Sequence, residues 1–346
     1  MKSFRKAFFV FFALFVLSIS FSNALAEDLP RAINIGTHGV GSFFNIVGTG
    51  VAKIVGKYTP MQTKVNPMGG PVAWMPMMVR GEVDLGVCNI WDASKGYMGE
   101  RTYDKLSAGK GFPVRLLTTG GVFNPYIVAA GSSDIKTIPD LKGKRVAAGF
   151  SKVPSVQDRF LGMLANGGLT MEDIKLVPVV APGPSVKAVT EGKADAAGGA
   201  ATGMALITEL SSKRGARALP LDPSEAAMKR LKEYWPFGWA AKVKGGTDPG
   251  IKEDTFLLEH ELYVLVRADL QDDAVYKIWE VMWKHNDELR KIHPKFDIWT
   301  TKSYISKTLA CPYHSGSVKF LKAKGLWTKE MDDAQNELLQ KKGVAK

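Results

Sequence analysis

Two segments of this chain repeat the same order of elements at nearly the same spacing. In each, a short apolar strand leads into a loop and a helix, and a second strand, a second helix and a third strand follow. Gly36 and Asp84 are 48 residues apart, and Gly149 and Asp195 are 46 apart. The third strands begin alike, with GEVDLG and GKADAA. Alternating strands and helices are typical of α/β proteins, so the repeat predicts two lobes of similar build.

Apolar periodicity and turn residues give approximate bounds for the repeated elements. The first repeat is expected to hold strands at Ala32–Ile35, Gln62–Val65 and Val83–Cys88, with helices at Phe43–Val55 and Val72–Arg80. The second is expected to hold strands at Arg145–Ala148, Leu176–Val180 and Ala194–Ala197, with helices at Val156–Asn166 and Ser185–Glu191.

Two extended apolar segments, Phe123–Ala130 and Leu258–Val266, flank the second repeat. If both are hinge crossover strands, the chain leaves the first lobe and returns to it. Lobe one would then comprise residues 27–126 and 261–346, and lobe two residues 127–260. The sequence therefore predicts one bilobal body rather than independent domains.

Helices are expected in the later part of the chain as well. Asp272–Arg290 has apolar residues near helical spacing. Asp222 has the character of an N-cap, followed by a proline and then a glutamate three positions on, which predicts a helix running to Tyr234.

The N-terminus has the form of a secretory signal. A basic start, MKSFRK, precedes the uncharged run Phe8–Ile19, and Ala24-Leu25-Ala26 supplies an A-x-A cleavage site. The run is short for an uncleaved membrane anchor, the main alternative. Residues 1–26 are therefore predicted to be a signal peptide. No later run approaches a spanning helix, so the mature protein is expected in the periplasm without a membrane span.

The net charge indicates the class of ligand, and the cysteine content bears on disulfides and metal sites. Loss of the three basic signal residues lowers the formal net charge from +12 to +9, which favours anionic ligands. No basic stripe with interleaved aromatic residues is present, so nucleic acid is not expected as a partner. Cys88 and Cys311 could pair in an exported protein, although Cys88 has the setting of a buried free thiol. No zinc signature occurs, and no metal or cofactor is expected.

The segment Ile33–Ile46, INIGTHGVGSFFNI, runs from a strand through a glycine-rich turn into a helix. Backbone N–H groups at such a helix N-terminus form an anion site. Gly36 and Gly41 have phosphate-loop spacing, but Ser42-Phe43 replaces the required Lys-Ser/Thr. Phe44 stands where a dinucleotide fingerprint needs Gly or Ala. The turn therefore predicts capture of a small anion rather than a nucleotide.

Equivalent loops of the two repeats should face one crevice, because ligands bind at strand ends in open α/β sheets. Ser42 could instead only cap its own helix. Lys152 could be an ordinary solvated lysine. The candidates for ligand binding in these loops are Thr37, Gly39, Ser42, Phe43, Ser151, Lys152 and Ser155.

Further candidates follow the third strand of each repeat or lie near the predicted hinges. Asn89 can donate and accept hydrogen bonds, and Trp91 can form a wall for an organic ligand. Thr202 occupies the corresponding place in the second repeat, and Tyr126 and Trp235 lie near the hinges. For the aromatic residues, packing in the core is the competing interpretation. Asp84 and Asp195 are expected to organise strand entry rather than to bind ligand.

Catalytic signals are weak. Of the five histidines, only His38 falls in a predicted crevice loop, and no G-x-S-x-G elbow is present. No catalytic residue is assigned, and the protein is predicted not to be an enzyme.

The ordered set of motifs resembles the substrate-binding proteins of tripartite ATP-independent periplasmic (TRAP) transporters, in particular the TAXI family. The likeness covers nearly the whole mature chain. It is carried by INIGTHGVGSFFNIVG, GEVDLGVCNIWDA, DLKGKRVAAG, EGKADAAGGAATG, VKGGTDPGI and CPYHSGSVKFLKAKGLW.

The resemblance implies a type II periplasmic-binding-protein fold, in which two lobes close like a Venus flytrap. It also implies delivery of a small organic acid or amino acid to a TRAP membrane permease. Family positions match Thr37, Ser42, Phe43, Asn89 and Ser151 as crevice residues. The chain departs from the family in Phe43-Phe44, where tyrosines are frequent, and in its second-lobe loop. Two other roles remain open on this scaffold: a ligand-sensing partner of a membrane sensor kinase, and a periplasmic enzyme.

Overall fold

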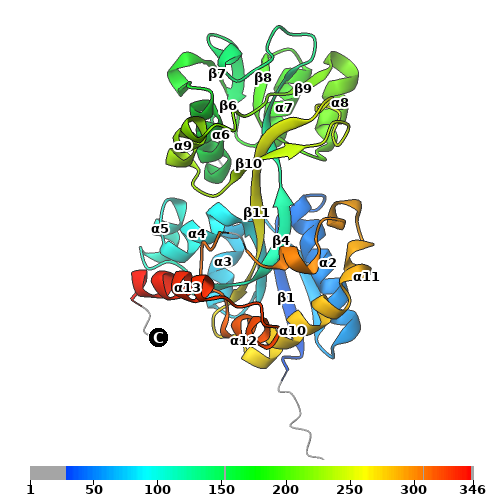
Figure 1. Ribbon diagram of the computed structural model, residues 1–346, viewed down its shortest axis with the longest axis vertical. Coiled ribbons are helices and arrows are strands. Elements are labelled where there is room, and N and C mark those ends of the chain that lie inside the picture. The colour runs from blue at the N-terminus through cyan, green and yellow to red at the C-terminus, as the bar shows by residue number, and fades with distance from the viewer. Residues whose placement is uncertain (1–28, 152, 307, 344–346) are drawn as a thin grey trace, which may run out of the picture.

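The computed structural model describes residues 29–151, 153–306 and 308–343. The predicted signal peptide lies outside these residues. Figure 1 shows two lobes, one above the other, joined by long strands. Lobe 1 is the part built on a six-stranded sheet, and lobe 2 is the part built on a five-stranded sheet.

Lobe 1 holds the N-terminal elements and all of the C-terminal helices. Its strands follow the order β2-β1-β3-β11, and β4 pairs with β11 beyond them. Helix α10 packs on α2 and on α12, so the end of the chain covers the sheet formed by its beginning. The elements are β1 (Ala32–Thr37), α2 (Phe43–Tyr58), β2 (Gln62–Pro67), α3 (Pro71–Val79), β3 (Leu85–Asn89), α4 (Ile90–Met98), α5 (Thr102–Ser107), β4 (Val114–Phe123), β11 (Thr255–Arg267), α10 (Asp272–Lys284), α11 (Asn286–Arg290), η3 (Pro294–Phe296), η4 (Thr301–Tyr304), α12 (Ser315–Ala323) and α13 (Lys329–Lys341).

Lobe 2 repeats this arrangement with the strand order β7-β6-β8-β5-β9. Its elements are β5 (Pro125–Ala130), η1 (Pro139–Leu141), β6 (Arg145–Ala148), α6 (Pro154–Asn166), η2 (Met171–Asp173), β7 (Lys175–Pro178), α7 (Pro182–Thr190), β8 (Ala196–Ala201), α8 (Ala205–Arg214), β9 (Ala216–Ala218) and α9 (Glu225–Tyr234). Strand β10 (Trp239–Val243) leads back toward lobe 1 and pairs with the first residues of β11.

Each lobe is completed by a strand that arrives from the other. In lobe 1, β11 runs antiparallel between β3 and β4; in lobe 2, β5 runs antiparallel between β8 and β9. The three parallel strands of each repeat lie beside these crossovers. Both crossover segments form strands within the sheets of the lobes. The lobes are therefore connected by strands rather than by a free linker (Figure 1).

The repeat extends to single hydrogen bonds. The carboxylate of Asp84 accepts the backbone N–H of Asn34 at 2.8 Å, and that of Asp195 accepts the backbone N–H of Arg145 at 2.9 Å. Each aspartate therefore ties the entry of one parallel strand to its neighbour. This is the structural role expected for both residues.

Two helix predictions need correction. Ser224, not Asp222, caps α9, because its hydroxyl accepts the N–H of Ala227, whereas Asp222 accepts the N–H of Ser224. The helix predicted over Asp272–Arg290 is broken at His285, where φ is −108° and ψ is 26°. In lobe 2, α6 and α7 begin at prolines, since a proline suits the first turn of a helix.

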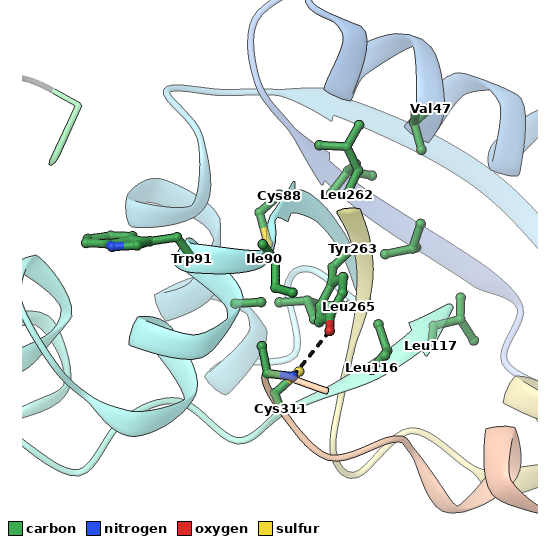
Figure 2. Packing of buried hydrophobic residues seen from close by; sticks show 14 of the residues in the cluster. Val47, Cys88, Ile90, Trp91, Leu116, Leu117, Leu262, Tyr263, Leu265 and Cys311 are labelled. Atoms are coloured by element: carbon green, nitrogen blue, oxygen red, sulfur yellow. Dashed lines mark hydrogen bonds between the residues drawn. The ribbon is translucent and has the colours of Figure 1, made fainter. Parts of the chain in front are cut away.

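The core of lobe 1 surrounds both cysteines. Cys88 on β3 and Cys311 are buried and free, so the expectation of a free buried thiol at Cys88 is confirmed. Figure 2 shows them packed with Tyr263 of β11 and with aliphatic side chains such as Leu265. The Tyr263 hydroxyl accepts the N–H of Ala310 at 3.2 Å, which satisfies a polar atom inside this apolar cluster.

Candidate functional site

A cleft of about 420 Å³ lies between the two lobes. Its size suits a small organic molecule. Five helices present their first residues or N-caps to it, so partly positive helix ends converge there. Lobe 1 contributes His38, Gly41, Ser42, Phe43, Phe44, Asn89, Phe123 and Lys295; lobe 2 contributes Val153, Ser155, Val156, Arg159, Pro182, Gly199, Ala201, Thr202, Gly203, Met204 and Ala205.

Five of the candidates from sequence line this cleft: Ser42, Phe43, Asn89, Ser155 and Thr202. Some of their polar atoms already have partners. The Ser42 hydroxyl accepts the N–H of Asn45 at 3.2 Å and so caps α2. The side-chain oxygen of Asn89 accepts the backbone N–H of Asp92 at 2.8 Å and so caps α4, while its side-chain amide donates to the Ser155 hydroxyl at 3.4 Å. Helix capping, the alternative role of Ser42, is therefore observed at the N-termini of both α2 and α4.

Four other candidates are buried away from the cleft, each with an internal hydrogen bond. Thr37 donates to the carbonyl of His38 at 2.9 Å. Tyr126 donates to Asp248 at 2.7 Å.

The other two are tryptophans, and both donate through the indole N–H. That of Trp91 reaches Asp158 at 3.2 Å. That of Trp235 reaches the carbonyl of Phe237 at 2.7 Å. The competing interpretation of core packing thus describes the buried aromatic candidates better.

The remaining candidates fall on the loops. Gly39 and Ser151 are exposed and do not line the cleft. Lys152 lies outside the described residues.

Arg159 also lines the cleft, although it is not among the residues predicted from the sequence. It sits on α6 and is only 4 % exposed, and its Nε has no hydrogen-bond partner among the described residues. Burial lowers the pKa of its guanidinium to about 10, an effect opposed by the negative charge of Asp92. Its pKa still leaves it charged at neutral pH. The helix places a buried, incompletely satisfied cation at the wall of the cleft.

Aromatic rings hold the Arg159 side chain in place. The guanidinium carbon lies 5.7 Å from the centroid of the Phe123 ring and 6.0 Å from that of Trp235. Cation–π attraction compensates part of the cost of burying the charge. The signal in the sequence that could have found it is its position: Arg159 lies four residues after Ser155, itself a candidate, on the same helix.

Two further side chains shape the electrostatics of the cleft. Lys295, from η3, donates through Nζ to the carbonyl of Thr202 at 2.5 Å and lies 4.8 Å above the Phe43 ring. Burial lowers the pKa of Lys295. His38 stacks on Phe44 with ring centroids 4.2 Å apart, and burial lowers its pKa to about 4, so it is neutral at pH 7. The field of the cleft is therefore positive.

Hydrogen bonds cross from lobe to lobe beside the cleft. We call Trp91, Arg101 and Asp158 the interlobe latch. The carboxylate of Asp158 in lobe 2 accepts the Trp91 indole N–H and two bonds from the Arg101 guanidinium, at 2.8 and 2.7 Å. Together with the bond from Lys295 to Thr202, the latch holds the lobes against each other.

These features define the class of protein. Two lobes of matching topology, strand crossovers between them and a cleft at the boundary form a two-lobed type II periplasmic-binding-protein fold, so the predicted fold class is confirmed. The chain belongs to the NMT1-like family, whose model matches residues 35–325.

Several solved structures are similar. The periplasmic aliphatic sulphonate binding protein SsuA from Escherichia coli is 17% identical, with 88% of this chain and 91% of that chain covered and a TM-score of 0.45. A putative sulfonate-binding SsuA from Methylobacillus flagellatus is 16% identical, with 92% and 96% covered and a TM-score of 0.49. The L-cystine solute receptor of Neisseria gonorrhoeae is 15% identical, with 77% and 92% covered and a TM-score of 0.40. The fold assignment rests on the strand order of this chain itself.

The two-lobed fold that the resemblance implies is the one observed. The TAXI branch and the TRAP permease stay predictions. Among the described residues, no helix combines the length and apolarity that a membrane crossing requires.

Proposed function

We propose that this protein is a solute receptor that closes its two lobes around a small organic anion. The observation that carries the proposal is Arg159, a buried cation in the cleft whose Nε lacks a hydrogen-bond partner in the described part of the chain. Burying a charge with an unsatisfied hydrogen-bond donor is costly, and a carboxylate or sulfonate seated on the guanidinium would reduce that cost beyond what the charge of Asp92 does. The converging helix N-termini add to the same preference for an anion.

The resemblance to TAXI proteins supports the finer assignment. We propose that the receptor works in the periplasm, after removal of the signal peptide, and delivers its ligand to the membrane permease of a TRAP transporter. Binding without chemistry fits the cleft, because His38 is neutral and stacked on Phe44 rather than paired with a nucleophile.

Within this proposal, Ser42, Phe43, Asn89, Ser155 and Thr202 line the ligand, and Arg159 binds its acidic group. The latch and Lys295 act on closure, because they join the lobes rather than face a ligand with free groups. Ligand binding would then select the closed arrangement by adding contacts to both lobes at once.

Calorimetric titration of the mature protein with a panel of carboxylates and sulfonates tests this function. We expect at least one member to bind, and Arg159→Met to weaken that binding roughly 10–100-fold, since hydrogen bonds to charged groups contribute about 1.5–3 kcal/mol. Arg80→Met is the matched control, because Arg80 pairs with Glu82 on the exposed surface. Equal affinities of the Arg159 and Arg80 variants would refute the role of Arg159. Absence of binding across the panel would refute the receptor.

A further inference from the structure

The cleft has a chemical asymmetry that goes beyond a general preference for anions. None of its lining residues, all within the described part of the chain, is an aspartate or a glutamate. Two cations, Arg159 and Lys295, face it. A ligand with an ammonium group would therefore meet like charges and no carboxylate.

Three buried carboxylates bond to residues of the lining or adjoin them in sequence, and each already accepts hydrogen bonds. Asp92 accepts from the Asn89 amide at 2.6 Å and from the Tyr103 hydroxyl at 2.7 Å. Asp158 accepts from the other two latch residues, Trp91 and Arg101.

The third, Asp248, is occupied as well. It accepts from the Tyr126 hydroxyl at 2.7 Å and from the backbone N–H of Gly203 at 2.8 Å. To turn toward a ligand, any of the three would have to give up bonds that organise the fold. An ammonium group in the cleft would remain poorly compensated, and a buried uncompensated charge is expensive.

The two cations are not equivalent. Lys295 donates to the Thr202 carbonyl and covers the Phe43 ring, so its ammonium is engaged in joining the lobes. Arg159, by contrast, has an Nε that bonds to none of the residues that the structure describes. The arrangement provides one principal seat for an acidic group rather than two.

The rest of the lining is suited to an apolar body. The rings of Phe43, Phe44 and Phe123 come from lobe 1, and Val156 and Met204 face them from lobe 2. The Phe44 and Phe123 rings are tilted with centroids 6.1 Å apart. Such rings gain from burying hydrocarbon surface, while a second charged end would lose its hydration without a partner.

We propose that the ligand is an organic monoanion with an apolar body and without an ammonium group, such as a branched or aromatic 2-oxo acid or a simple aryl carboxylate. This inference rests on the proposed receptor function and specifies its ligand class. The acid sits on Arg159, the body lies against the three phenylalanine rings, and α-amino acids are rejected by the positive, carboxylate-free lining.

Matched probe pairs test the absence of the ammonium group. In calorimetric titrations of the mature protein, phenylpyruvate is compared with L-phenylalanine, and 4-methyl-2-oxopentanoate with L-leucine. Each pair keeps the carboxylate and the side chain and changes only the α-substituent. We expect the 2-oxo acid to bind at least 10-fold more tightly in both pairs. Equal or tighter binding of the amino acids overturns this inference and leaves the receptor function standing.

A second set of probes tests the apolar body. We expect phenylpyruvate to bind at least 10-fold more tightly than pyruvate, and Phe44→Ser to shrink that ratio. Succinate and 2-oxoglutarate test for a second acidic seat. A preference for pyruvate or for a dicarboxylate overturns the inference while the receptor function stands. If no probe and no other organic anion binds, both proposals fail.

Discussion

The indole N–H of Trp91 in lobe 1 donates a hydrogen bond of 3.2 Å to the carboxylate of Asp158 in lobe 2. Arg101, also in lobe 1, donates twice to the same carboxylate. A single aspartate thus collects donors from across the lobe boundary. These bonds exist only while the lobes are together, so they shift the equilibrium toward the closed arrangement.

Removing the latch charge should therefore open the molecule. We expect Asp158→Asn to increase the radius of gyration of the ligand-free protein in small-angle X-ray scattering. Anion affinity should weaken roughly 2–10-fold. The effect is modest because Arg101 is 58% exposed, and exposed ion pairs contribute only about 0–1 kcal/mol. Asp134→Asn, which removes an ion pair with Lys144 inside lobe 2, is the control. An unchanged radius in the Asp158 variant would argue against the latch.

His260 makes the stability of the fold sensitive to acid. It is fully buried on β11 between Phe123 and Trp235, with ring centroids 5.5 and 5.3 Å away, and its Nε2 has no partner among the described residues. Burial, with a contribution from the Arg159 charge, lowers its pKa from 6.5 to about 3. The unfolded chain therefore binds one more proton than the folded protein between these pH values. Stability must fall as the pH falls through that window.

We expect His260→Leu to abolish the uptake of this proton on unfolding, because the variant lacks the group that binds it. Urea unfolding from pH 7 to pH 4 should show a free energy of unfolding that declines less steeply in the variant. The difference in slope should approach about 1.4 kcal/mol per pH unit well below pH 6.5, the value for one proton. Parallel pH profiles of the two proteins would mean that His260 is protonated in the folded state.

Gly86 on β3 lies directly against a tryptophan. A Cβ built there would come within 2.3 Å of the Trp74 ring, which is fully buried. We expect Gly86→Ala to lower the free energy of unfolding by about 2–3 kcal/mol, the usual cost of overpacking a core. Gly69→Ala is the control, since no atom of the described residues lies within 4 Å of its Cβ position. Similar urea midpoints for both variants would show that Trp74 can be displaced.

Most of the fold could be predicted from the sequence, because the elements of each repeat follow from local sequence patterns. Each strand, loop and helix follows from neighbouring residues, and the shared spacing of Asp84 and Asp195 reflects the hydrogen bonds that both make at strand entry. The residues of the candidate site were harder to predict from the sequence. Trp91 and Tyr126 have the chemistry of ligand-binding residues, but their polar atoms are satisfied by Asp158 and Asp248, which lie 67 and 122 positions away.

The burial of Arg159 could not be predicted, because it depends on packing between distant parts of the chain. An arginine on a helix is usually solvated, and only the packing of lobe 2 against Phe123 shows that this one is buried. Lys295 comes from the end of the chain and reaches the cleft through the return of β11 to lobe 1. Such long-range placement is not encoded in local patterns, whereas capping at Ser42 and Asn89 is.

Both cysteines should be unreactive in the native protein. They are buried, and burial raises the pKa of each thiol, that of Cys311 to about 12 and that of Cys88 well above its usual range. The thiolate is the reactive species, so native protein at pH 8 should release almost no thionitrobenzoate from Ellman's reagent. In 8 M urea without reductant, two thiols per chain should react, because neither cysteine is paired. A chain that yields no thiol in urea until a reductant is added would contain a disulfide, and the core around Tyr263 would then have to rearrange to bring the two sulfur atoms together.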